Sequence, residues 1–233
     1  MIVNPSKFQT IIIDHCRTNY NPQLFSIDGK EIKSKTSVTL LGLEIDSKLN
    51  FENHISTICK KAAGQLNALC RLKSFLSKEQ KTAIANSFIF SNFNYCPLIW
   101  HFCSSHATNK MENIQKRTLR FVHSDYESDY ETLLKKSNKC TMTIRRLRSV
   151  ALEVFRTIND LNPSYLRNLF VKNSDSKRHY KNLKIPSRNT VTFGDKSIRI
   201  LGPHVWNQLP ERLKSETSFP IFKKSLSDWF GPK

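Results

Sequence analysis

The sequence contains little glycine and few acidic residues. Glycine occurs only 6 times in 233 residues. Because tight β-turns depend on glycine, this scarcity disfavours an all-β fold and favours helices. Asp and Glu number 19 against 37 Lys and Arg, which leaves a net charge of +18. A field of that sign attracts polyanions, so nucleic acid is the leading class of partner. The alternative is a basic protein whose charge serves only solubility.

Other features that would indicate common functions are also missing from the sequence. No apolar run approaches the length of a membrane span, and Asn4-Pro5-Ser6-Lys7 interrupts any apolar segment at the start. We therefore expect no membrane association and an intracellular protein of the nucleus or cytoplasm, not a secreted one. The sequence holds no phosphate-binding glycine loop, no dinucleotide-binding fingerprint and no Ser-His-Asp arrangement.

The cysteines are scattered and form no C-x-x-C motif, and most lie in apolar stretches, which predicts free buried thiols. One group of possible zinc ligands occurs within eleven residues, but its spacing matches no common zinc site, and we predict no metal site. The cysteines are Cys16, Cys59, Cys70, Cys96, Cys103 and Cys140, and the group also includes His101 and His106.

The first fifty residues are predicted to form the edge of a β-sheet. The β-branched run at 7–13 suits a buried strand. Asp28-Gly29 lies between two short apolar segments and predicts a hairpin. Val38–Asp46 reads as a further strand, in which Gly42 indicates a bulge or the close approach of another backbone.

Helical spacing of apolar residues begins at Phe51. The first helix is predicted over 51–75, with Asn50 as its cap, and Ser77 with Gln80 predicts a capping box for the next. That second helix is predicted to continue through Ile84, Phe88 and Ile89 to the apolar stretch at 95–102 as a central core helix, which Pro97 kinks or restarts. Further helices are expected at 108–122, 130–136 and 142–161.

The composition of the chain changes after residue 170. Residues 171–190 are polar and basic, which predicts a linker with little core of its own. The segment 191–233 is predicted to form a small module, with a hairpin turn at Gly194-Asp195. The predicted fold is α+β and mostly helical, with a small antiparallel β element, a helical bundle and a small C-terminal module. The predicted domains are 1–50, 51–170, 171–190 and 191–233.

Five segments in order resemble one family. They read VTLLGLEIDSKLNFENHI, ICKKAAGQLNALCRL, FIFSNFNYCPLIWHF, MENIQKRTLRFV and, near the end, SIRILGPHVWNQLPERLKSETSFPIFKKSL. Together they are similar to the part after the catalytic palm in non-LTR retrotransposon reverse transcriptases of the jockey-like kind. The resemblance implies that 1–50 is a palm remnant, that 51–170 is the thumb and that the parent activity is RNA-directed DNA synthesis.

The resemblance also implies roles for particular residues. Asn4-Pro5-Ser6-Lys7 matches a family motif whose lysine is thought to act as a general acid near the leaving pyrophosphate, which makes Lys7 the candidate catalytic residue. The alternative is an ordinary lysine at a strand edge. Leu41-Gly42 matches the primer grip, a hairpin with a Leu-Gly pair in that family, where glycine lets two backbones approach closely. The alternative there is a simple bulge.

A thumb needs basic helix faces that follow phosphates without reading bases. The alternative for each basic cluster is an ordinary solvated face. The candidate nucleic-acid-binding residues are Lys60, Lys61, Arg71, Lys116, Arg117, Arg120, Arg145, Arg146 and Arg148.

The family's catalytic carboxylates have no counterpart here. Polymerisation needs two metal ions held by closely spaced carboxylates, and the sequence contains no Asp-Asp pair. The intact polymerase would use Mg²⁺, whereas we predict no cofactor for this piece and no polymerase activity from it alone. The expected partner is a template–primer duplex of RNA and DNA. Two alternatives are a free-standing nucleic-acid-binding protein domesticated from an element and a helical protein-interaction domain.

Overall fold

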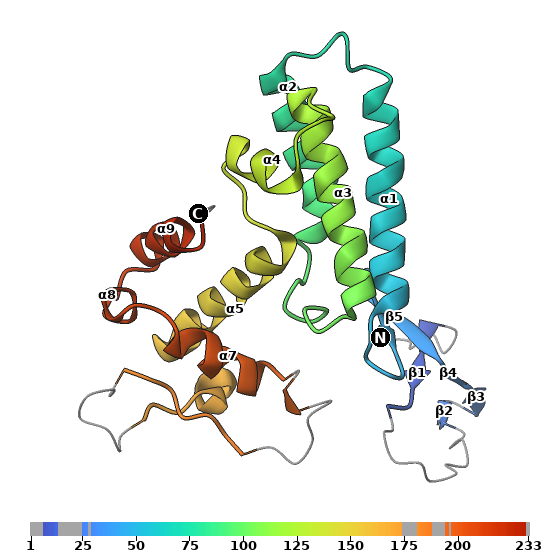
Figure 1. The fold of residues 1–233 in the computed structure, drawn as a ribbon. Helices are drawn as coiled ribbons and strands as arrows, with labels where there is room; N and C mark the ends of the chain where they lie inside the picture. The colour runs from blue at the N-terminus through green and yellow to red at the C-terminus, as the bar shows by residue number, and fades with distance from the viewer. Residues whose placement is uncertain are drawn as a thin grey trace. The chain divides into compact units, whose positions relative to one another are not determined.

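The structure of the chain, a computed structural model, describes residues 7–13, 25–27, 29–173, 181–187, 194–195 and 197–231. In these residues the fold is α+β and mostly helical, which confirms the predicted class (Figure 1). Contacts divide the chain into two compact units. The first unit comprises residues 1–96 and 102–114, and the second comprises residues 97–101 and 115–233. The predicted domain boundaries stay predictions, and each of them falls inside one of these units.

Short strand pairs make up the β part of the first unit. The hairpin predicted around Gly29 is confirmed, because Ile27 pairs with Lys30 in antiparallel register. The strand predicted at 7–13 is shorter and less buried than expected, since Phe8 and Ile13 are exposed. The pairs are β1 (Thr10–Ile11) with β4 (Ser34–Lys35) in parallel, β2 (Phe25–Ile27) with β3 (Lys30–Ile32), and β5 (Ser37–Leu40) with β6 (Leu43–Asp46).

The segment predicted as one strand over Val38–Asp46 is a hairpin instead. Leu41 and Gly42 both have positive φ, 49° and 84°, and the strands on either side pair from Leu40 to Leu43. Two consecutive residues with positive φ make the turn type whose twist matches that of paired strands. Gly42 is therefore neither a bulge nor part of a strand; it is the second residue of a two-residue turn.

Helix α1 (Glu52–Cys70) follows β6 directly (Figure 1). Asp46 organises its start, because its carboxylate accepts hydrogen bonds from the amides of Asn50, at 3.2 Å, and Phe51, at 2.7 Å. Asn50 is not the N-cap that we predicted; Phe51 occupies that position, with a φ of 57°. The helix also ends five residues earlier than predicted, at Cys70.

Helix α2 (Lys78–Ile84) begins at the predicted capping box, in which Ser77 and Gln80 hydrogen-bond each other's backbone amides. It continues as a π-helix, η2 (Ala85–Ile89), and a 3-10 helix, η3 (Phe90–Phe93). The core helix predicted at 95–102 does not form. Cys96 has a φ of 47°, Pro97 lacks an amide hydrogen, and the segment runs as turns. Only Trp100 of the segment is fully buried.

The core of the first unit lies between α1 and the η2–η3 segment, which contact each other. Along α1, a buried residue recurs at helical spacing, so one face packs inward and the opposite face is left to solvent. The fully buried residues here are Ile55, Ala62, Leu66, Ala85, Ile89 and Phe90.

The predicted helices at 108–122, 130–136 and 142–161 are observed, with small shifts at their ends. They are α3 (Ser105–His123), α4 (Tyr130–Lys136) and α5 (Met142–Ile158). Asp129 caps α4 by accepting a hydrogen bond from the Thr132 amide. Asp125 accepts from Lys136 and Ser128, and these bonds hold the pKa of its carboxyl far below the usual range.

In the second unit, α5 packs against α7 (Ile198–Asn207) and α9 (Phe219–Trp229). The rings of Phe155 and Phe222 stack with centroids 4.1 Å apart, and Trp206 packs beside Phe222. A single core therefore joins a helix of the predicted thumb to the predicted C-terminal module. The short helices η4 (Ser164–Leu169) and α8 (Glu211–Lys214) complete the unit.

The described parts of the predicted linker pack against this core. Asn207 acts as a clamp, because its side chain accepts from the Leu183 amide at 2.8 Å and donates to the Leu183 carbonyl at 3.0 Å. The Trp206 indole donates to the Lys181 carbonyl at 2.9 Å, and Leu183 is buried. The hairpin turn predicted at Gly194-Asp195 is not observed, since Ser197 caps a helix directly afterwards.

Candidate nucleic-acid interface

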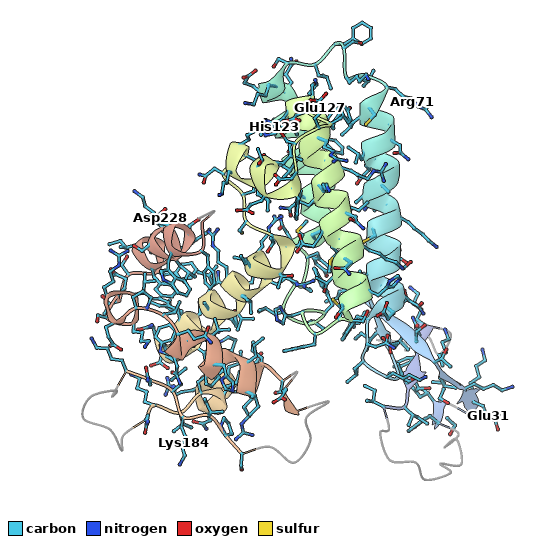
Figure 2. The ribbon with its side chains drawn as sticks, viewed as in Figure 1. Glu31, Arg71, His123, Glu127, Lys184 and Asp228 are labelled. Carbon is cyan, nitrogen blue, oxygen red and sulfur yellow. The ribbon has the colours of Figure 1, made fainter. Side chains whose placement is uncertain are left out.

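The exposed face of α1 carries the first predicted cluster. Lys60, Lys61 and Arg71 are all exposed. Lys60 and Arg71 are eleven residues apart, which places them within about 20° of each other around the helix and about 16 Å apart along it. Figure 2 shows Arg71 at the end of α1. Its charge suits this end, where the helix dipole is negative.

The stripe between these cations has little bulk and no negative charge. Gly64, Asn67 and Ala68 are exposed between Lys60 and Arg71. From residue 53 to residue 78 the chain contains no acid. A polyanion can therefore approach the α1 backbone closely without meeting a carboxylate.

The β5–β6 hairpin is fixed to the beginning of the same helix. The Glu44 amide donates to His54 Nδ1 of α1 at 3.4 Å. Desolvation by burial lowers the pKa of His54, so the ring stays neutral and able to accept this bond near pH 7. His54 lies about 10 Å along the helix from Lys60 and Lys61. Leu41-Gly42 and the α1 cluster thus belong to one compact unit.

The tip of this hairpin is tied by a residue that we did not select from the sequence. The Tyr95 hydroxyl donates to the Leu41 carbonyl at 2.5 Å. The Leu41 side chain is 84% exposed and makes no core contact. Tyr95 lies inside the resemblance segment FIFSNFNYCPLIWHF, but its partner is 54 residues away, and no local pattern predicts that contact.

Lys7, the candidate general acid, is exposed and lies just before β1. The residues Asn4, Pro5 and Ser6 of its motif lie outside the described residues. Its catalytic role stays a prediction, as does its alternative as an ordinary surface lysine.

The second predicted cluster lies on α3. Arg117 is exposed, whereas Lys116 and Arg120 are half-buried. Arg120 Nε is buried and has no hydrogen-bond partner among the residues that the structure describes. Arg117 is therefore the most accessible cation of this cluster.

The third predicted cluster is not an exposed helix face. Arg146 is only 5% exposed, and its guanidinium lies 5.8 Å from the centre of the Trp100 ring. Burial lowers the pKa of Arg145, while Cys140 opposes that shift. Arg148 is half-buried. The stem of an arginine covers apolar surface well, so here Arg146 serves packing rather than display of charge.

The histidine and cysteine group at 96–106 lies on turns and in the first turn of α3, and the absence of a metal site stays a prediction. In the described ranges, no three His, Cys, Asp or Glu side chains come together as metal ligands. Burial and the nearby Arg146 lower the pKa of His101 to about 4. The described cysteines are free, and only Cys59 is buried. Burial raises the pKa of the Cys59 thiol to about 11. Cys16 lies outside the described residues.

The second unit contains a cavity of about 420 Å³. Its walls combine apolar side chains, such as Leu134, Ile144 and Trp229, with Lys135 and Lys139. Desolvation lowers the pKa of Lys139. We did not predict this cavity, because it brings together residues nearly 100 positions apart.

Among the described helices, none is long and apolar enough to span a membrane.

Comparisons of the chain with protein-family models, curated proteins and solved structures found no match.

Proposed function

We propose that the chain is a nucleic-acid-binding module that holds a duplex through its phosphates. The observation that carries this proposal is the exposed, acid-free face of α1, with Lys60 and Lys61 near its middle and Arg71 at its end. Cations spaced along one helix face, with small residues between them, suit the repeating charge of a phosphate backbone. The overall charge of +18 adds long-range attraction of the same sign.

We further propose that the module corresponds to the C-terminal part of a non-LTR retrotransposon reverse transcriptase. The support is the resemblance of five ordered segments. The arrangement of the first unit agrees with it, because the Leu41-Gly42 turn is attached to the helix that carries the basic face. In this reading α1 and the helices after it act as a thumb, and the turn lies near the primer.

The experiment is a salt series. Purified chain is titrated into a labelled RNA–DNA hybrid of about 20 base pairs between 50 and 300 mM KCl. Three phosphate contacts from the α1 cluster alone predict a slope of about −3 in a plot of log K against log salt. A second hybrid of unrelated sequence should bind equally well. An affinity that does not change with salt would exclude the proposal.

The same protein should not incorporate nucleotides with Mg²⁺, because the two-metal mechanism needs carboxylates that the sequence does not contain as a pair. Incorporation of a labelled nucleotide on a primed RNA template measures this directly. Any product that depends on the protein and on Mg²⁺ would contradict the fragment reading.

The apolar cavity in the second unit favours a second candidate, a helical protein-interaction domain. Charge would then be incidental to its function. Absence of binding to any duplex at physiological salt would favour this candidate over the first.

A further inference from the structure

The loop between α1 and α2 presents an aromatic ring to solvent. Phe75 is 81% exposed, and Leu72 is also exposed. The apolar spacing predicts a helix that runs to residue 75, with Leu72 on its apolar side. The helix ends at Cys70, so these side chains leave the helical face and point away from the core.

The loop has regular hydrogen bonds, and Phe75 is held in place by them. The Leu72 amide donates to the Leu69 carbonyl at 2.9 Å, and the Phe75 amide donates to the Leu72 carbonyl at 3.0 Å. Two residues later, the Ser77 capping box begins α2. These bonds order the backbone, and the exposed ring gains no stability from burial, which makes it suited to a partner.

The surroundings of the ring are cationic. Arg71, Lys73 and Lys78 lie within four residues of Phe75 in the sequence and are exposed, and the nearest acid along the chain is Glu79. The Glu79 carboxylate accepts a hydrogen bond from the Ser77 hydroxyl at 2.9 Å, within the first turn of α2. The loop therefore combines one flat apolar surface with several positive charges. Unpaired nucleotides have the complementary combination, a flat base and a charged phosphate.

We propose that Phe75 stacks on an unpaired base of a nucleic-acid strand, while Arg71, Lys73 and Lys78 hold the neighbouring phosphates. The loop is then a site for single-stranded nucleic acid at the end of the α1 face. This inference rests on the proposed function and adds a preference for unpaired nucleotides. One ring and one leucine among three cations suit stacking better than insertion into a lipid surface, which more apolar side chains would have to enter.

The test compares Phe75→Ala with the wild-type chain in binding to a 12-nucleotide single strand and to a blunt duplex of the same length. Loss of one stacked base should weaken single-strand binding by about tenfold. Binding to the blunt duplex should change less than about twofold, because its bases are paired and enclosed. The salt slope should stay the same, since no charge is removed. Phe75→Trp should retain the single-strand affinity.

Phe88→Ala is the matched control. Phe88 is also an exposed phenylalanine of the first unit, on η2, and has no lysine or arginine within six residues in the sequence. The Phe88→Ala variant should bind the single strand and the blunt duplex as tightly as the wild type does. A strand with 2-aminopurine gives a second readout, because stacking on Phe75 changes its fluorescence in the wild type and not in Phe75→Ala.

The outcomes separate the two proposals. A wild-type chain that binds no nucleic acid would overturn the proposed function and this inference together. A wild-type chain that binds with a steep salt slope, and a Phe75→Ala variant that binds single strands equally well, would overturn this inference alone. A Phe75→Ala variant that loses only binding to vesicles of phosphatidylserine and phosphatidylcholine would assign the loop to membranes and also overturn it.

Discussion

The hydroxyl of Tyr95 donates a hydrogen bond to the main-chain carbonyl of Leu41, across 54 residues of sequence. The bond ties the exposed tip of the β5–β6 hairpin to the segment that follows η3. A two-residue turn at the end of a short hairpin otherwise has few contacts to hold it. The position of the turn relative to α1 therefore depends partly on a single side chain.

Replacing Tyr95 by Phe should loosen the hairpin tip without unfolding the unit. Hydrogen exchange of the Leu43 and Gly42 amides should become about 3- to 10-fold faster, the size expected for loss of one hydrogen bond. Tyr126→Phe is the control, because Tyr126 is exposed and its hydroxyl makes no hydrogen bond within the described part of the chain. Unchanged exchange in Tyr95→Phe would mean that the strand pairing alone holds the turn.

Replacing Lys60 and Lys61 together by Gln should make the slope of log K against log salt less negative by about 2. Each lost phosphate contact reduces the size of this slope by about 1. The control is the double replacement of Lys223 and Lys224 by Gln on α9, where two adjacent lysines are also exposed. The control variant has the same net charge as the Lys60 and Lys61 variant, but all residues of its α1 face are unchanged. If both variants reduce the slope equally, total charge governs binding rather than this face.

Replacing Arg146 by Ala should affect stability more than binding. The side chain is buried against Trp100, so its removal leaves a void and is expected to cost about 2 kcal/mol of unfolding free energy. Chemical denaturation measures this loss. Arg117→Gln, at an exposed position, should change stability less than Arg146→Ala does and should weaken binding. An Arg146→Lys variant that folds as stably as the wild type but loses affinity would identify Arg146 as a phosphate contact instead.

Stability should fall as the pH is lowered from 6.5 to 4. In the folded chain the pKa of His101 is about 4, because burial and the Arg146 cation disfavour its charged form, whereas in the unfolded chain it is near 6.5. Between these values the unfolded state binds more protons, so acid favours unfolding. The loss is roughly 2–3 kcal/mol and is complete near pH 4.

Denaturation curves at several pH values test this expectation. In the variant His101→Gln, the unfolding free energy should change much less between pH 6.5 and 4 than in the wild type. His54, whose pKa is also lowered, should account for part of the change that remains. Replacing the exposed His106 by Gln should leave the slope unchanged. An unaltered slope in His101→Gln would show that other groups control acid unfolding.

Two glycines should respond in opposite directions to alanine. A Cβ at Gly202 would lie 2.5 Å from Phe170 Cε1 and 3.0 Å from Val154 Cγ2, so Gly202→Ala should destabilise the second unit by about 1–3 kcal/mol. A Cβ at Gly64 would meet nothing within 4 Å, and Gly64→Ala inside α1 should add about 0.5–1 kcal/mol. Thermal unfolding should give a lower midpoint temperature for Gly202→Ala and a higher one for Gly64→Ala. Equal changes in midpoint temperature would mean that Phe170 does not approach α7 as described.

Local sequence signals predicted the elements that short-range contacts define. The capping box at Ser77 and the helix at 130–136 depend on contacts between residues three or four positions apart. The Leu41-Gly42 pair marked a special backbone position, but its neighbours looked like one continuous strand. The local pattern did not predict the turn, whereas the resemblance to a primer-grip hairpin implied one, and the strands on either side do pair.

For the candidate site too, some features follow from the sequence and others from the tertiary structure alone. The sequence by itself determined the excess of positive charge, the order of the helices and the acid-free stretch around α1, because these follow from composition and short-range spacing. Only the tertiary structure decided which cations reach solvent: Lys60 does, whereas Arg146 is covered by Trp100. It also decided that Phe75 lies outside the core and that Asn207 clamps Leu183. Burial is a property of surfaces brought together from distant parts of the chain, and a local pattern carries no information about the partner that covers it.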